Sequence, residues 1–378
     1  MGRTVVVVGQ GNIGSHTGQL VARKAECTTV TLCDRDKYEK SNVISQCITS
    51  GEAGRGKAQV QALRLKRINP ALSVTAIPEP VENVPMGRLR GDLLLGCVDN
   101  RKARQYLSET ARHLGIPFVD GGVHADGLLA RVSVFPPHAE AACVECSWTQ
   151  RDYDLIERLN FPCQVAHAPT GTSVAASAPR TGAPAELGAL AAALQVIECG
   201  PFLTGAPPRL DGAYEIVVDA KSGRTLVSRI PRNAHCRMAD HAPWRIRRIA
   251  EAPEDITLAQ ALALGSPSGT GARLWLAHQP FVTRLGCMGC GDELEMLRLR
   301  RAIGDRERVC RKCRGRLEPT AADLVSSLTL DEVSAGTRAR TLCSLGFDAH
   351  DIFTVLGGGA NDPQHFELCG VDARTTRR

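Results

Sequence analysis

Hydrophobic residues near the N-terminus form short unbroken runs. The run at residues 4–8 reads Thr-Val-Val-Val-Val and stops at Gly9. β-Branched residues that are apolar on both faces of a strand are typical of a buried parallel sheet. Similar runs follow at residues 28–33, 72–77, 93–96 and 118–120. We therefore expect these five segments to be strands of one sheet.

Segments with helical spacing of apolar residues separate these runs, at 13–24, 56–69 and 102–114. Pro70 ends the second of these helices, because proline has no backbone N–H and cannot continue a helix. Strand and helix thus alternate over about the first 130 residues. The alternation predicts an α/β fold with a Rossmann-like, doubly wound and mostly parallel sheet.

The pattern changes after this alternation. Residues 163–185 are rich in Ala, Ser, Thr, Gly and Pro, which predicts a mobile crossover loop. A helix is expected next, at 186–198. The segments 214–219 and 225–230 then predict a β-hairpin.

Length and composition indicate two domains and exclude some classes of function. A chain of 378 residues exceeds the size, about 250 to 300 residues, at which single cores stop growing. The pattern changes again after Pro243, so we expect a first domain at 1–243 and a C-terminal module at 244–378. A net charge of +6 and 4% aromatic residues argue against a nucleic-acid partner. Because no long apolar run is present, we expect no membrane segment and a cytoplasmic location.

A glycine-rich turn follows the first strand. It reads Gly9-Gln10-Gly11-Asn12-Ile13-Gly14, and Asp34 ends the second strand. Such a turn lets backbone N–H groups approach a phosphate at a helix N-terminus, and an acidic residue at the end of the second strand can bind a ribose hydroxyl. Taken alone, the turn favours a nicotinamide or flavin dehydrogenase.

Polar motifs farther along the chain favour a different nucleotide. With the glycine turn they form an ordered series: Asp34-Arg35-Asp36, Ser41-Asn42, Gln46, Lys57, Ile68-Asn69-Pro70, Cys97-Val98-Asp99-Asn100 and Arg104. Through this series the chain resembles the ubiquitin-activating (ThiF/MoeB/HesA-type) adenylyltransferase superfamily, over about residues 5–240.

The resemblance implies an ATP and Mg²⁺ site. Asp34 would hold the ribose, Asn42 and Lys57 the phosphates, and Asp99 the Mg²⁺. The full implied set is Gly9, Gly11, Asn12, Gly14, Asp34, Asp36, Asn42, Gln46, Lys57, Asp99, Asn100 and Arg104. The implied reaction is adenylation of the C-terminal glycine of a ubiquitin-like or sulfur-carrier protein, in a homodimer that has a downstream conjugating enzyme as a further partner.

The residue types suit adenylation independently of the resemblance. A carboxylate attacks the α-phosphorus of ATP while pyrophosphate leaves, so the site must supply positive charge and a hard oxygen ligand for Mg²⁺. Lys57 and Asp99 supply one each. Taken singly, Lys57 reads as a solvated helix lysine and Asp99 as a turn residue, but their joint spacing favours catalysis.

Two departures from the family pattern remove positive charge from the phosphates. The arginine expected just before Gln46 is Ser45, and no arginine-bearing helix precedes the first strand. Arg35, Arg55 or a residue of a partner subunit are the candidates to replace that charge.

Cysteine spacing predicts a zinc ribbon in the C-terminal module. The pattern is Cys287-x₂-Cys290-x₁₉-Cys310-x₂-Cys313, among fifteen cysteines in all. Two C-x-x-C pairs place four thiolates around one Zn²⁺, and four protein ligands leave no position open for substrate. We therefore expect a structural zinc within residues 287–313.

A second zinc site is implied by the resemblance. It starts from Cys143 and Cys146 and calls for two more ligands after the hairpin, where Cys236 and His241 stand, with His235 as the substitute. Ala239 occupies the position expected for the fourth ligand. The alternative is a site that has decayed, leaving cysteines that only pack.

Cys163 opens the small-residue loop. In the family this loop carries the cysteine that takes the acyl group from the adenylate as a thioester, and an accessible thiolate is a competent nucleophile. The alternative is a loop cysteine without a role.

Three rival functions remain at this point. One is an adenylyltransferase for a small molecule, a peptide or a tRNA base that forms no thioester. Another is a non-catalytic scaffold subunit, which Ser45 favours and the presence of Asp34, Lys57 and Asp99 opposes. The third is a nicotinamide oxidoreductase. By analogy, the C-terminal module is expected to be a docking surface for the modifier or for a conjugating enzyme.

Overall fold

The computed structural model describes residues 2–160, 182–238, 240–266, 271–357 and 363–369. Cys163 and most of the expected crossover loop therefore lie outside the described residues. The chain forms two compact units, which are described separately. Unit 1 comprises residues 1–82 and 89–243, and unit 2 comprises residues 83–88 and 244–378.

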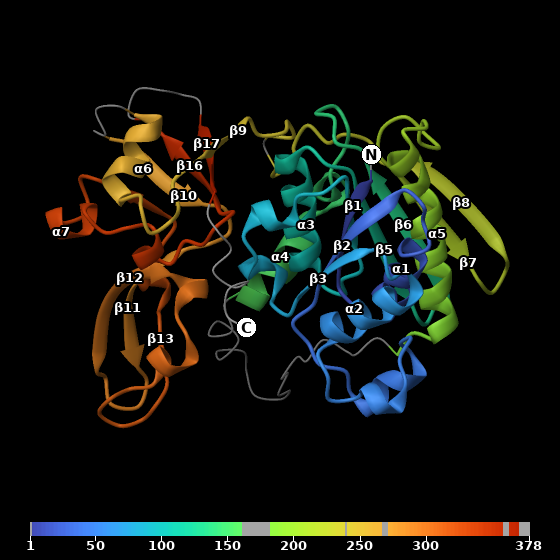
Figure 1. Ribbon diagram of the computed structural model, residues 1–378, viewed down its shortest axis with the longest axis horizontal. Coiled ribbons are helices and arrows are strands. Elements are labelled where there is room, and N and C mark those ends of the chain that lie inside the picture. The colour runs from blue at the N-terminus through green and yellow to red at the C-terminus, as the bar shows by residue number, and fades with distance from the viewer. Residues whose placement is uncertain (1, 161–181, 239, 267–270, 358–362, 370–378) are drawn as a thin grey trace. The chain divides into compact units, whose positions relative to one another are not determined.

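Unit 1 is built on an eight-stranded sheet in the order β3-β2-β1-β4-β5-β6-β7-β8 (Figure 1). The first five of these strands pair in parallel, and β6 to β8 continue the sheet in antiparallel pairs. The mostly parallel, Rossmann-like sheet predicted from the sequence is confirmed. The bounds are β1 Arg3–Val8, β2 Cys27–Cys33, β3 Ser73–Ile77, β4 Leu93–Gly96, β5 Phe118–His124, β6 Leu129–Phe135, β7 Tyr214–Asp219 and β8 Arg224–Arg229.

Helices cover both faces of this sheet. In Figure 1, α3 and α4 lie on one side of it and α1, α2 and α5 on the other. The sheet grows from β1 in both directions, and because β-α-β crossovers are almost always right-handed, the two directions place helices on opposite faces. The bounds are α1 Gly14–Val21, α2 Lys57–Ile68, α3 Arg101–Leu114, α4 Gln150–Asn160 and α5 Ala185–Thr204, with short 3₁₀ turns η1 Lys40–Ile44, η2 Ser50–Glu52 and η5 Val144–Ser147. Two further 3₁₀ turns, η3 Val81–Asn83 and η4 Met86–Leu89, each include residues of both units.

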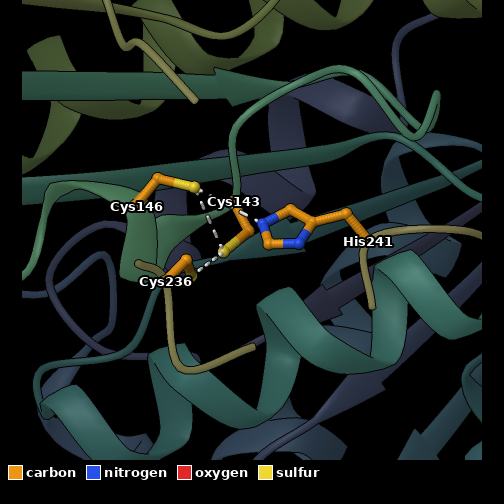
Figure 2. Close-up of side chains that lie close together, drawn as sticks. All are labelled: Cys143, Cys146, Cys236 and His241. Carbon is orange, nitrogen blue, oxygen red and sulfur yellow. Dashed lines mark hydrogen bonds between the residues drawn. The ribbon is translucent and has the colours of Figure 1, made fainter. Parts of the chain in front are cut away.

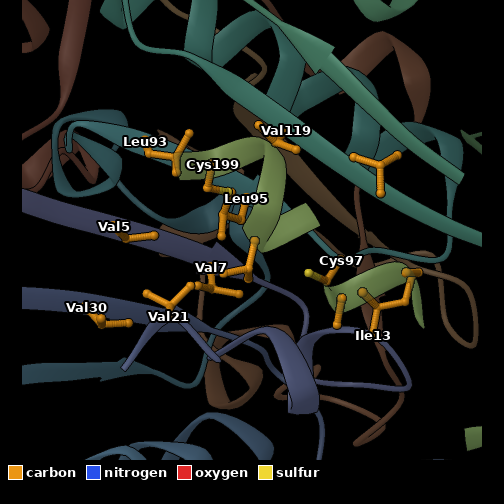
Figure 3. Close-up of a cluster of buried hydrophobic side chains, with 14 of the residues drawn as sticks. Val5, Val7, Ile13, Val21, Val30, Leu93, Leu95, Cys97, Val119 and Cys199 are labelled. Carbon is orange, nitrogen blue, oxygen red and sulfur yellow. The ribbon is translucent and has the colours of Figure 1, made fainter. Parts of the chain in front are cut away.

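The core of unit 1 lies between the sheet and the helices α1 and α5. Figure 3 shows Val5 and Val7 of β1 beside Leu93 and Leu95 of β4, all fully buried. Burying one such side chain is worth about 1.5 to 3 kcal/mol. The continuous apolar runs seen in the sequence are therefore the strands at the centre of the sheet.

Helix α5 is long and apolar enough to span a membrane by length and composition. Half of its most apolar stretch is buried inside unit 1, where Leu187, Val196 and Leu203 join the core. Core helices of globular domains pass the same test of composition, so α5 is explained by its packing.

Unit 2 contains two small sheets. One has the order β15-β10-β16-β17-β9, in which β17 and β9 are parallel, and the other has β11 at its centre, paired with β12, β13 and β14. The bounds are β9 Ile246–Ile249, β10 Arg273–Leu276, β11 Phe281–Cys287, β12 Glu293–Leu299, β13 Leu317–Glu318, β14 Leu324–Val325, β15 Ser327–Thr329, β16 Ile352–Leu356, β17 Gln364–Leu368, α6 Leu258–Gly265, α7 Ala335–Arg338, η7 Arg300–Ala302, η8 Asp305–Arg308, η9 Ala321–Asp323 and η10 Cys343–Leu345.

Candidate functional site

The glycine-rich turn needs its glycines for steric reasons. Gly9 has φ +87°, and a Cβ there would lie 2.4 Å from the carbonyl oxygen of Cys97. A Cβ on Gly14 would lie 1.8 Å from the carbonyl oxygen of Gly9. The turn therefore packs directly against the end of β4 and leads at once into α1. Helix α1 has no acidic residue in its first turn, which suits an anion at that end.

Asp34 connects two turns at the carboxyl ends of β1 and β2. Its Oδ2 accepts a hydrogen bond from the backbone N–H of Gln10 at 2.6 Å, and its Oδ1 accepts one from that of Asp36 at 2.8 Å. Burial raises the pKa of Asp34, and the Lys57 ammonium opposes that rise. Each oxygen has a second lone pair, so the carboxylate can still accept from a ribose hydroxyl.

Lys57 is the first residue of α2, and its side chain is only 12% exposed. Its Nζ lies 3.5 Å from Asp36 Oδ2 and 5.8 Å from the centre of the Tyr38 ring. The structure therefore does not support the reading of Lys57 as a solvated helix lysine. Its ammonium group is held beside the turn that contains Asp34.

Asn42 and Gln46 lie in and after the short turn η1. Asn42 Oδ1 accepts from the backbone N–H of Glu39 at 2.9 Å, and Gln46 Oε1 is buried without a hydrogen bond in the described part of the chain. Asn12 Nδ2 donates to the carbonyl oxygens of Ser45, at 2.6 Å, and Ala183, at 3.1 Å. Asn12 therefore fastens this segment to the glycine turn.

Asp99 follows β4 and is exposed. The next residue, Asn100, caps α3, because its Oδ1 accepts from the backbone N–H of Ala103 at 2.8 Å. Arg104 does not extend into solvent. Its Nη2 donates to the carbonyl oxygen of Val98 at 2.9 Å, and its Nε lies 2.7 Å from Asp120 Oδ2.

The sequence did not single out Asp120 or Arg131. Asp120 is buried in β5, and Arg131 of β6 places its Nη2 2.9 Å from Asp120 Oδ2. The signal available in the sequence was an acidic residue at the end of the predicted strand 118–120, where a parallel sheet collects its functional groups.

The sheet order explains how the predicted residues meet. Strands β2, β1 and β4 are adjacent and parallel, so Asp34, the turn at Gly9 and Asp99 emerge at the same edge. Lys57 joins them through its ion pair with Asp36. The carboxyl edge of a parallel sheet, next to a change in strand order, is the usual place for a nucleotide.

Four side chains predicted as metal ligands converge in unit 1 (Figure 2). Cys143 Sγ lies 3.9 Å from Cys146 Sγ and 3.6 Å from Cys236 Sγ, and Cys146 Sγ lies 3.4 Å from His241 Nε2. All four ligand atoms lie within 4.8 Å of one another. Three sulfurs and one imidazole nitrogen at these separations fit a tetrahedral Zn²⁺. His235 is exposed and is not in the cluster, and Ala239 lies outside the described residues.

Helix α3 braces the loop that carries the first two of these cysteines. Arg112 is buried and donates to the carbonyl oxygens of His138, Ala141 and Ala142. These bonds hold the backbone that leads into Cys143. The ligand pair therefore rests on a fixed support, which is typical of a structural metal site.

The ribbon cysteines of unit 2 also converge. Cys287 Sγ and Cys313 Sγ are 3.3 Å apart, Cys290 Sγ and Cys310 Sγ are 3.7 Å apart, and all four sulfurs lie within 4.8 Å of one another. A Cβ on Gly315 would lie 3.1 Å from Cys313 Sγ. The glycine keeps the second knuckle open around the thiolates, so the residues fit a closed four-thiolate zinc site.

Cys47 is a further cysteine of interest, for which no role was predicted from the sequence. It is half-buried, and Gln19 Nε2 lies 3.3 Å from its Sγ. A hydrogen bond with His16 lowers the pKa of the Cys47 thiol, against the effect of burial. The predicted thioester cysteine, Cys163, cannot be compared with it because it lies outside the described residues.

Comparison with known proteins gives one family match and several distant relatives. Residues 3–238 match the model of the ThiF family. Over 158 residues the chain is 28% identical to ubiquitin-like modifier-activating enzyme 5 of Branchiostoma floridae, which is 38% of each protein. Over 147 residues it is 29% identical to the sulfur carrier protein ThiS adenylyltransferase of Escherichia coli (strain K12), which is 38% of this chain and 57% of that relative. The chain thus spans only about two fifths to three fifths of the length of these relatives.

Among solved structures, E. coli MccB with ATP superposes with a TM-score of 0.48 at 19% identity, over 63% of this chain and 66% of that one.

Proposed function

The chain belongs to the ThiF family, and on that premise we propose that it is an ATP-dependent adenylyltransferase that activates the C-terminal glycine of a ubiquitin-like or sulfur-carrier protein. The observation that carries the proposal is the meeting of Asp34, Lys57 and Asp99 at one edge of the sheet, around the glycine turn. The names of the two relatives supply the class of substrate.

The proposed reaction is a substitution at the α-phosphorus of ATP. An oxygen of the substrate carboxylate forms a bond to that phosphorus, and the bond to the bridging oxygen of pyrophosphate breaks. The start of α1 and the Lys57 ammonium lie where they can stabilise phosphate charge, which grows on the leaving group. Asp34 fixes the ribose and so the position of the α-phosphorus.

Asp99 is suited to hold Mg²⁺. Its carboxylate is exposed, and hard oxygen ligands are the ones that Mg²⁺ prefers. Bound Mg²⁺ would neutralise charge on the phosphate oxygens. In this account Asp99 is a ligand and takes no proton, because the substrate carboxylate is already ionised at neutral pH.

The charge missing at Ser45 is best replaced by Arg35. Arg35 Nε lies 3.6 Å from Asp36 Oδ1, the carboxylate that also pairs with Lys57. It is largely exposed and can swing toward the outer phosphates. We expect Arg35→Ala to raise the KM for ATP about tenfold, the effect of removing about 1.4 kcal/mol of binding. Arg67→Ala, which removes an exposed arginine in the last turn of α2, is the matched control and should leave the KM unchanged.

A thioester step is the second part of the proposal. The Cys163 thiolate would attack the acyl carbon of the adenylate, with AMP as the leaving group. Incubation with carrier and MgATP should then give a covalent adduct that dithiothreitol cleaves and that Cys163→Ala cannot form. Cys343→Ala, which removes an exposed cysteine of unit 2, should still form it. If Cys163→Ala still forms the adduct, another residue carries the thioester. If neither the wild type nor Cys343→Ala forms an adduct, transfer without a thioester is favoured.

ATP-pyrophosphate exchange tests the adenylation step through matched variants. Asp99→Asn and Lys57→Ala should each lower exchange by about 10² to 10³, as expected for groups that stabilise transition-state charge. Lys66→Ala is the control, because Lys66 is an exposed lysine on the same helix as Lys57. Wild-type exchange rates in both Asp99→Asn and Lys57→Ala would exclude the proposed site.

A further inference from the structure

Asp120 is a buried carboxylate at the nucleotide edge of the sheet. Its side chain is 1% exposed, and its backbone pairs with Gly96, the last residue of β4. Burying a carboxylate is costly unless its charge is neutralised and its lone pairs are filled. The contacts of Asp120 therefore indicate why the chain places it there.

Two arginines satisfy this carboxylate. Arg104 Nε lies 2.7 Å from Oδ2 and 2.9 Å from Oδ1, and Arg131 Nη2 lies 2.9 Å from Oδ2. Arg131 is shared with a second acid, since its Nη1 lies 3.3 Å from Glu215 Oε2. The four charges sum to zero, so this network holds its members in place and does not form an anion site.

The backbone is shaped around the network. A Cβ on Gly96 would lie 3.0 Å from Asp120 Oδ1 and 2.9 Å from the Phe118 ring. A Cβ on Gly122 would lie 3.1 Å from both Nε and Nη2 of Arg131. All four distances are shorter than most Cβ contacts in proteins, so the two glycines make room for the carboxylate and for the guanidinium group.

Arg104 transmits the position of Asp120 to the loop after β4. While its Nε is fixed by Asp120, its Nη2 donates to the carbonyl oxygen of Val98 at 2.9 Å. Val98 directly precedes Asp99 in the sequence. On the other side of Asp99, Asn100 is held as the cap of α3. The carbonyl group before Asp99 and the side chain after it are thus both held by hydrogen bonds.

We propose that Asp120 is a positioning residue, which through Arg104 and the Val98 carbonyl sets the orientation of the Asp99 carboxylate for Mg²⁺. The inference rests on the proposed function, in which Asp99 holds the metal. It also gives Arg104 a role in place of the direct contact with ATP that the family resemblance implied. Groups that orient a metal ligand typically change metal affinity by 10-fold to 100-fold when they are replaced.

The test is the gain in ATP affinity that Mg²⁺ produces, measured by calorimetric titration of the full chain with ATP in magnesium and in EDTA. We expect Asp120→Asn to lower that gain about tenfold or more and to leave ATP affinity in EDTA unchanged. Glu198→Gln is the matched control. Glu198 is a buried carboxylate of α5 that binds Arg209 and Tyr214 away from the site, so its loss should affect stability but not the magnesium gain.

A second variant covers the case in which Asp120→Asn does not fold. Arg104→Lys keeps the charge beside Asp120 but lacks the planar fork that reaches the Val98 carbonyl, so it should lose the gain as well. If the variant that folds shows the same magnesium-dependent increase in ATP affinity as the wild type, the inference is overturned and the proposed function stays intact. If wild-type chain binds no ATP under either condition, the proposed function itself fails and the inference fails with it.

Discussion

Asp34 shows how one residue can serve both the fold and the site. Its two oxygens accept from the backbone N–H groups of Gln10 and Asp36, so the carboxylate ties the turn after β1 to the turn after β2. A side chain in this role must accept hydrogen bonds at both oxygens. This requirement is stricter than that of a ribose ligand alone, which needs one acceptor.

Replacing Asp34 by asparagine should therefore destabilise the chain even without nucleotide. The amide NH₂ would face the N–H of Gln10 or that of Asp36, and a buried donor without an acceptor costs about 1 to 3 kcal/mol. Thermal denaturation of Asp34→Asn should show a lower Tm than the wild type. Asp126→Asn, at an exposed position, should melt like the wild type, and an unchanged Tm in both would contradict this account.

Cys47 allows a test in which ionisation and exposure act in opposite directions. Cys343 is the more exposed of the two thiols, but its partial burial and nearby acidic residues raise its pKa. The hydrogen bond with His16 lowers the pKa of Cys47. The thiolate is the reactive form, so iodoacetamide at pH 7 should label Cys47 before Cys343. Peptide mapping by mass spectrometry measures both rates. His16→Ala should slow labelling of Cys47, and faster labelling of Cys343 in the wild type would show that exposure dominates.

At the scale of elements, an ion pair joins η2 to α2. Glu52 of η2 accepts hydrogen bonds from the guanidinium group of Arg64 and from the backbone N–H of Thr49. The Arg64 hydrogen bonds lower the pKa of Glu52 to about 2. The pair fastens the segment after Gln46 to the helix that begins with Lys57, so it supports two residues of the predicted nucleotide site at once.

This pair gives the stability of the chain a defined dependence on pH. Because the pKa of Glu52 is lower in the folded chain than its ordinary value of 4.5, its stabilisation is fully present above about pH 4.5 and is lost as the pH falls toward 2. Glu52→Gln should reduce the free energy of unfolding by about 1 to 3 kcal/mol at pH 7. Urea denaturation at pH 7 and pH 3 should show this difference shrinking at the lower pH. If the difference in unfolding free energy between the wild type and Glu52→Gln grows as the pH falls, the predicted direction of the pH dependence is wrong.

The two cysteine clusters give a further prediction at this scale. Each cluster joins two separate segments of the chain, and each offers four ligands to one ion. Elemental analysis should find two zinc ions per wild-type chain, and one each in Cys236→Ala and Cys287→Ala. Cys343→Ala is outside both clusters and should keep two. Two zinc ions retained in Cys236→Ala would show that the cluster in unit 1 binds no metal.

The sequence predicted some elements much better than others, for physical reasons. Strands β1 and β4 were predictable because a strand covered by helices on both faces must be apolar throughout. Strand β6 was missed, because Arg131 and Ser133 interrupt its apolar pattern to serve the polar network around Asp120 and Glu215. The helix predicted at 186–198 continues as α5 to Thr204, although Pro201 stands in its last turn.

The residues of the candidate site were also unequally predictable from the sequence. The glycine turn, Asp34, Lys57 and Asp99 follow strands or begin helices, so spacing along the chain placed them. Asp120 also stands at the end of a predicted strand, but its role could not be predicted from that position, because the role comes from partners on α3 and β6. His241 was predicted as a ligand only because the family pattern requires ligands after the hairpin.

The chain combines a domain that matches the ThiF family with a second region that lies outside that match. The ThiF match ends at residue 238, and unit 2 contains the second cysteine cluster and two sheets outside that match. The short strands of unit 2 were not predicted, because β9 pairs with β17 more than a hundred residues away. The proposed nucleotide chemistry therefore belongs to unit 1, and the role of unit 2 as a docking surface remains a prediction.

We propose that this chain adenylates a protein that ends in glycine. The direct measurement is ATP-pyrophosphate exchange by the full chain with Mg²⁺ and each glycine-ended ubiquitin-like or sulfur-carrier protein of the same genome. We expect one such carrier to drive exchange, and the same carrier without its terminal glycine to leave exchange at background. Exchange that persists after the glycine is removed, or that no carrier stimulates, would contradict the account.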